Sequence, residues 1–62
     1  MTLREARFFK RLTQWDVSIK TKIPQTKISL IERGYVEASE NEKKALSKAL
    51  GVPVSELFKE EK

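Results

Sequence analysis

Two side chains that many enzymes depend on are missing from this 62-residue sequence, which has no cysteine and no histidine. Their absence removes thiolate and imidazole metal ligands, disulfides, and every Ser–His or Cys–His nucleophile pair. The carboxylates and lysines show no spacing typical of a catalytic site, and so small a domain has little room for a deep pocket. We therefore expect no enzymatic activity, no cofactor, no metal site and no small-molecule ligand.

Basic and amide side chains offer a different chemistry, and they gather between residues 12 and 34. This stretch is expected to form two short helices joined by a tight turn, with Gln25, Thr26 and Lys27 at the start of the second helix. That layout is typical of a DNA-reading helix-turn-helix, in which the second helix enters the major groove.

Charge is distributed unevenly along the chain. Residues 1–34 carry eight basic and three acidic side chains, a net charge of +5, whereas residues 35–62 carry five basic and six acidic ones. The asymmetry indicates either a polyanionic partner for the first half or a solvated surface on a slightly basic protein. No apolar run approaches the roughly 20 residues that span a bilayer, and no signal-peptide pattern is present. We expect a cytoplasmic protein that does not enter a membrane.

The elements that must position these residues are predicted to be five helices in one domain over residues 1–62. Capping-box pairs predict three of the helix starts: Thr2 with Glu5, Thr13 with Asp16, and Ser39 with Glu42. Proline predicts another start, and glycine predicts two helix ends. The expected helices span residues 3–11, 14–21, 24 or 25 to 33, 40–50 and 54–58, with Gly34 and Gly51 as left-handed caps.

The apolar spacing fits a compact helical bundle. The predicted core consists of aliphatic side chains from the last four helices and from three links: Leu12, Val17, Ile23, Ile28, Ile31, Leu46, Leu50, Val52, Val54 and Leu57. Ser18 is a small residue where the second and third helices should cross, and we assign it to packing. The aromatic residues allow two interpretations. Either Phe9 and Trp15 enlarge the core, or Phe8, Trp15 and Ile19 form an exposed apolar patch for a partner.

Several motifs together resemble the phage-repressor type of helix-turn-helix, the Cro and repressor (XRE) family of bacteria and phages. They are Leu12-Thr13-Gln14, the small Ser18, the aliphatic Ile23, the run Ile28-Ser29-Leu30-Ile31-Glu32-Arg33-Gly34, and the C-terminal ALGVPVSELF. The resemblance covers almost the whole chain. It implies an all-α, compact five-helix lambda-repressor-like domain, with the helix-turn-helix as its second and third helices.

The resemblance also implies roles for individual residues. Gln25 would bond adenine, Thr26 would offer a methyl group to thymine, and Lys27 would reach guanine or a phosphate. Leu30, one turn beyond Thr26, would either touch a thymine methyl or pack against the protein. Arg7 and Glu32 match a partly buried structural ion pair that joins the first and third helices. Gln14 would hold a phosphate and steady Gln25, and Ser29 would contact a phosphate or cap locally. Further phosphate contacts are expected from Lys10, Arg11, Lys22 and Tyr35.

Two positions depart from the family pattern. Lys22 occupies the turn between the second and third helices, where the family often has glycine, and a left-handed lysine carries a conformational cost. The loop at residues 35–38, which is often basic in the family, is here Tyr-Val-Glu-Ala. The Tyr35 hydroxyl is the group in this loop that could still donate to a phosphate.

The sequence therefore predicts a transcriptional regulator that binds specific double-stranded DNA. One domain of this size covers only a few base pairs, so a homodimer on a palindromic operator is expected. We expect its contact near the C-terminus, with Leu57 facing inward and Phe58 facing the partner. The alternative is a protein-interaction module of the same fold, such as an antitoxin or an accessory subunit.

Overall fold

The computed structural model describes residues 2–58, and this part of the chain is compact and all-helical, with five helices and no strand. The two ends of the expected domain, residue 1 and residues 59–62, lie outside the described residues. The all-α prediction is confirmed. The helices are α1 (Leu3–Phe9), α2 (Gln14–Thr21), α3 (Gln25–Arg33), α4 (Glu40–Leu50) and α5 (Val54–Leu57).

Local capping explains where the helices begin. Each of the three predicted capping boxes is formed: the hydroxyl of Thr2, Thr13 or Ser39 accepts from the backbone N–H three residues later. The carboxylate of that later residue accepts from the N–H of the cap residue. Such reciprocal bonds satisfy two backbone donors that a helix start otherwise leaves unpaired. By contrast, α3 and α5 follow Pro24 and Pro53 and have no side-chain cap.

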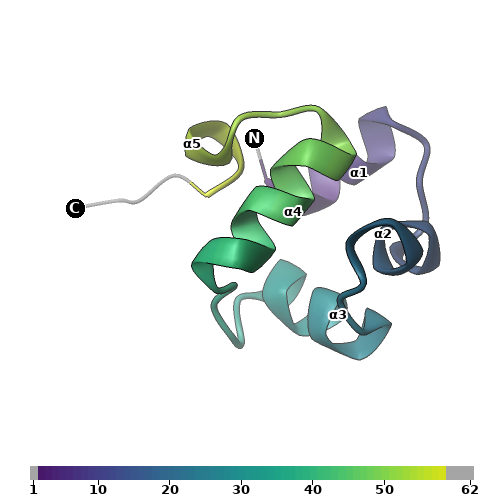
Figure 1. The fold of residues 1–62 in the computed structure, drawn as a ribbon. Helices are drawn as coiled ribbons and strands as arrows, with labels where there is room; N and C mark the ends of the chain where they lie inside the picture. Colours follow the sequence, from purple (N-terminus) through teal and green to yellow (C-terminus); the bar gives the residue numbers. More distant parts are fainter. Residues whose placement is uncertain (1, 59–62) are drawn as a thin grey trace.

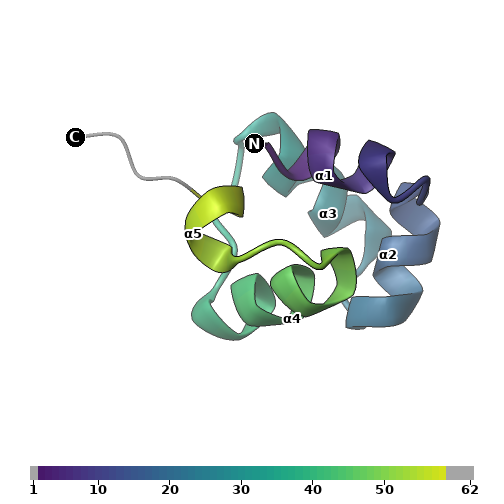
Figure 2. The same ribbon diagram turned by 90° about the horizontal axis from the view of Figure 1, so that it is seen from above.

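The helices pack around a small apolar core. Helix α2 packs against both α3 and α4, and α4 packs against α5 (Figure 1). Figure 2, seen from above, shows α1 on the side of the domain opposite α4. The buried apolar residues come from all five helices and two of their links: Leu3, Ala6, Val17, Ile23, Ile28, Ile31, Ala38, Leu46, Leu50 and Leu57. Of the expected core residues, Leu12 and Val52 are partly buried at its edge, and Val54 is also only partly buried.

Two helices end earlier than the sequence predicts. Helix α1 ends at Phe9 rather than Arg11, because Arg11 adopts a left-handed conformation with a φ of 58°. No glycine marks this stop, so sequence patterns give no warning of it. Helix α5 ends at Leu57 rather than Phe58, whose φ of −125° and ψ of 56° leave the helical region. Leu57 is buried as expected, while Phe58 packs partly against the core.

One type of turn occurs twice in the fold, and it was not predicted from the sequence. The Ser18 hydroxyl donates to the Ile23 carbonyl at 2.6 Å, and the Ser47 hydroxyl donates to the Val52 carbonyl at 2.6 Å. Each turn contains a left-handed residue, Lys22 with a φ of 64° in the first and Gly51 with a φ of 70° in the second. Each turn has the pattern serine, four residues, an aliphatic residue and proline. Ser18 thus ties α2 to the start of α3, in addition to being small.

Candidate nucleic-acid interface

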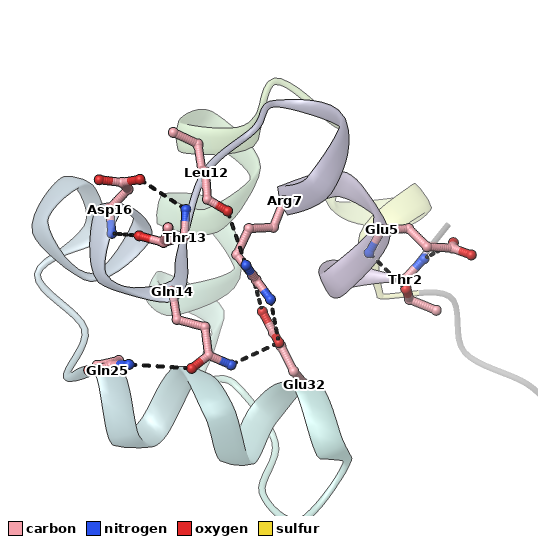
Figure 3. A network of polar contacts seen from close by, with 9 residues as sticks. All are labelled: Thr2, Glu5, Arg7, Leu12, Thr13, Gln14, Asp16, Gln25 and Glu32. Carbon is pink, nitrogen blue, oxygen red and sulfur yellow. Dashed lines mark hydrogen bonds and ion pairs between the residues drawn. The ribbon is translucent and has the colours of Figure 1, made fainter.

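An ion pair between Arg7 of α1 and Glu32 of α3 lies at the centre of the polar contacts (Figure 3). Arg7 Nε donates to Glu32 Oε2 at 2.7 Å, Arg7 Nη2 donates to Glu32 Oε1 at 3.3 Å, and Arg7 Nη1 donates to the Leu12 carbonyl at 3.0 Å. The exposed fractions of the two side chains are 10% and 5%. The structure thus brings together the two residues that the family resemblance pairs, and it adds the Leu12 carbonyl as a third partner.

Two glutamines extend this network to the start of α3. Gln14 Nε2 donates to Glu32 Oε1 at 3.0 Å, and Gln25 Nε2 donates to Gln14 Oε1 at 3.5 Å, the long end of hydrogen-bond range. Gln14 lies between Glu32 and Gln25 in Figure 3. A primary amide has two N–H donors and a carbonyl acceptor, so Gln25 keeps one donor and its oxygen for an outside partner. That donor–acceptor pair is what bidentate contact with adenine requires.

The first turn of α3 presents side chains to solvent and begins without a side-chain cap. Gln25 and Thr26 are exposed, and Leu30, one turn later, is 37% exposed. Because Pro24 provides no side-chain cap, the first N–H groups of α3 are not used in a capping bond. Uncapped amides at a helix start carry partial positive charge and favour a phosphate or another anion.

Lys27 stands apart from the other expected base-reading residues. Its ammonium lies 2.8 Å from Glu42 Oε2 on α4, and the side chains are 40% and 20% exposed. This ion pair directs the Lys27 charge toward α4 and neutralises it there. Sequence patterns could not reveal the contact, because the two residues belong to different helices.

A polar cleft of about 240 Å³ contains two of the expected phosphate contacts, Gln14 and Ser29. Its other lining residues are Arg4, Arg7, Glu32 and Arg33. Arg4 and Arg33 were not among the predicted phosphate contacts, although each lies close in sequence to a member of the Arg7–Glu32 pair. Both are exposed, so the cleft has two guanidinium groups that the buried ion pair does not use.

The remaining expected phosphate contacts, Lys10, Arg11, Lys22 and Tyr35, do not line this cleft. Lys10 Cε and Nζ lie 3.3 Å from the position that a Cβ on Gly51 would occupy, which places the ammonium beside the C-terminus of α4. A cation there interacts favourably with the helix dipole. Arg11, Lys22 and Tyr35 are exposed, and the two basic residues hold left-handed backbone conformations.

The interpretation that Phe9 and Trp15 enlarge the core is wrong. Phe9 is 77% exposed and Trp15 is 60% exposed, because the small core is already filled by aliphatic side chains. Phe8 and Ile19 are also exposed, at 57% and 63%. The guanidinium groups of Arg7 and Arg4 lie 4.8 Å and 5.5 Å from the centre of the Phe8 ring, within cation–π range.

Comparisons with known proteins leave the chain without an assigned relative. No protein-family model, no curated protein and no solved structure matches it. Over residues 2–58, no group of acidic residues is arranged to hold a metal ion, and none of the helices has the length and apolar character needed to cross a membrane.

Proposed function

We propose that this protein is a transcriptional regulator that recognises a specific double-stranded DNA sequence with the first turn of α3. In this proposal the domain is lambda-repressor-like, α2 and α3 act as a helix-turn-helix, and α3 enters the major groove. Gln25 and Thr26 read base edges, with Leu30 against a thymine methyl. Lys27 joins them only when it leaves Glu42.

The observation that carries the proposal is the chain of bonds from buried Glu32 through Gln14 to Gln25. These bonds hold the exposed Gln25 amide at the start of α3. A glutamine without them would lose more rotamer freedom on binding, which would weaken the affinity. The basic first half and the uncapped amides of α3 add electrostatic support for a phosphate backbone nearby.

Phosphate contacts would set the register on the duplex. Gln14, Ser29, Arg4 and Arg33 are the candidates around the polar cleft, and Lys10, Arg11, Lys22 and Tyr35 are candidates elsewhere. A homodimer on a palindromic site would supply the two recognition helices that useful affinity requires.

Selection of bound sequences from random duplex DNA tests the proposal. The protein should enrich one sequence, and its affinity should fall by about 0.9 log units per log unit of salt for each phosphate neutralised. Gln25→Ala should lower affinity for that sequence by about 1–3 kcal/mol and relax the preference at one base pair per half-site. The control is Lys20→Ala, which should weaken all sequences alike or none. An unchanged sequence preference in Gln25→Ala would remove Gln25 as a reader.

A protein-interaction module, such as an antitoxin or accessory subunit, is the second candidate. The exposed apolar side chains of Phe8, Phe9, Trp15 and Ile19 favour it, since such residues often mark protein contacts. Under this alternative the protein binds no selected duplex, or binds it with an affinity that does not depend on salt.

A further inference from the structure

The ion pair between Lys27 and Glu42 has a consequence for sequence discrimination. Lys27 is the third residue of α3, directly after Gln25 and Thr26, so its charge belongs to the turn proposed to face DNA. In the structure that charge is directed at α4, with the ammonium 2.8 Å from Glu42 Oε2. The charge in the first turn of α3 is therefore paired with α4, while the exposed side chains beside it, Gln25 and Thr26, are neutral.

Glu42 is held in place by a second, independent contact. Its Oε1 accepts from the Ser39 backbone N–H at 2.9 Å, and the Glu42 N–H donates to the Ser39 hydroxyl at 3.2 Å. These bonds form the capping box of α4 and leave Oε2 free to receive Lys27. The hydrogen bond from Lys27 and the one from the Ser39 backbone both hold the pKa of the Glu42 carboxyl below its ordinary value of 4.5. The acceptor that Lys27 meets is thus fixed by α4 and not by Lys27 itself.

We propose that Glu42 is a specificity-determining positioning residue, an inference that rests on the proposed function. By holding Lys27, Glu42 keeps the lysine charge away from DNA, so the neutral side chains of α3 determine which sequence is bound. Contacts between lysine and phosphate strengthen binding to every sequence, whereas contacts to base edges distinguish sequences. In a non-specific complex α3 has no fixed register, so a released Lys27 could turn to whichever phosphate is nearest. On the preferred site Gln25 sets the register, and Lys27 has less freedom. Releasing Lys27 should therefore strengthen non-specific binding more than it strengthens binding to the preferred site.

The substitution Glu42→Gln separates the two contacts of this side chain. Capping boxes accept glutamine in place of glutamate, so the amide oxygen can stay on the Ser39 N–H. The amide nitrogen then takes the position of Oε2, and because it is a donor it cannot accept from Lys27. Helix α4 should remain capped while Lys27 is released.

The experiment measures binding of the full chain to its selected duplex and to a random duplex over a range of salt concentrations. In Glu42→Gln, the slope of log affinity against log salt for the random duplex should steepen by about 0.9, the value of one added phosphate contact. Relative to equal binding of the variant and the parent at 1 M salt, that slope makes the variant bind the random duplex about eightfold more tightly at 0.1 M salt. The ratio of specific to non-specific affinity should fall.

Two controls isolate the mechanism. Glu40→Gln removes the same charge two residues earlier on α4, at an exposed position that makes no ion pair with Lys27, and it should leave the ratio and the slope close to those of the parent. In a Lys27→Met background, Glu42→Gln should have no further effect, since no lysine remains to be released. Circular dichroism of each variant checks that the helices are retained.

The possible results distinguish this proposal from the proposed function. An unchanged ratio in Glu42→Gln, or equal tightening on both duplexes, overturns the role of Glu42 and leaves DNA recognition standing. Weaker binding to the selected duplex, with a changed preference at a G·C pair, would instead show that Glu42 holds Lys27 in place to read guanine. If the unaltered protein selects no sequence, both proposals fail.

Discussion

Removing the Arg7 charge should have a larger effect on stability than any surface substitution in this domain. In Arg7→Met, the Glu32 carboxylate, 5% exposed, keeps the Gln14 amide but loses both guanidinium bonds. The Leu12 carbonyl also loses its donor. Breaking a buried ion pair by removing one partner costs about 3–5 kcal/mol, because the remaining charge is uncompensated.

That cost is comparable to the whole stability of the domain. At about 0.05–0.15 kcal/mol per residue, a chain of 62 residues has a free energy of unfolding of about 3–9 kcal/mol. Arg7→Met should therefore be largely unfolded or melt far below the parent. The double variant Arg7→Met with Glu32→Leu should regain much of the loss, since no buried charge remains. Recovery should be incomplete, because the Leu12 carbonyl and the Gln14 amide still lack their partners.

Urea denaturation followed by circular dichroism at 222 nm measures these differences. The parent, the two single variants and the double variant form a double-mutant cycle, whose coupling energy isolates the pair. Because Arg7→Met can be unfolded without urea, its melt should be repeated in sucrose, which favours the folded state. Two single variants each within about 1 kcal/mol of the parent would refute the reasoning, because the pair would then behave as a solvent-screened surface contact.

Three further predictions concern other parts of the fold. Lys22→Gly should stabilise the domain by about 0.5–1 kcal/mol in thermal melts, because glycine adopts the left-handed conformation without the cost of a Cβ; Gly51→Ala, at the equivalent turn, should destabilise it. The pKa of Asp16 is lowered in the folded state mainly by the Thr13 backbone N–H, and the pKa of Glu42 mainly by Lys27. Both carboxylates therefore stabilise the fold at pH values above their ordinary pKa values of 3.8 and 4.5. That stability should be lost as the pH falls through the lowered pKa values, seen as urea midpoints that decrease below about pH 4.5, and midpoints that stay constant down to pH 2 would contradict it. Phe58→Glu should abolish self-association in sedimentation while Phe58→Leu preserves it; a parent that is monomeric even on DNA would remove the dimer.

Local patterns predicted the five helices of residues 2–58 and most of their bounds. Each capping box joins residues three apart, so Thr13 with Asp16 contains all the information needed to start α2. The bounds of α2 and α4 therefore agree with the sequence. Arg11 shows the limit of such patterns, since a non-glycine residue in the left-handed region carries no signature in the sequence. The exposure of Phe9 is likewise a property of the filled core and not of the residue itself.

The candidate site likewise contains residues that the sequence identifies and a contact that it does not. Gln25 and Thr26 could be chosen from the sequence because a helix start can be recognised locally, and the family pattern pointed to Arg7 with Glu32. The contact of Lys27 with Glu42 joins two helices, and no local pattern determines it. Spacing along the chain can identify a lysine near a site, but only the packing of α3 on α4 shows where its charge is directed.

The polar network also links the stability of the domain to its proposed function. Glu32 accepts from Arg7 and from Gln14, and Gln14 in turn accepts from Gln25. The same buried carboxylate therefore neutralises the buried Arg7 charge and anchors Gln14, which bonds to the proposed reader, Gln25. In the double variant Arg7→Met with Glu32→Leu, the fold should return while Gln14 loses its anchor, so restored stability should be accompanied by weaker sequence discrimination. Discrimination equal to that of the parent would show that Gln25 needs no support from the core.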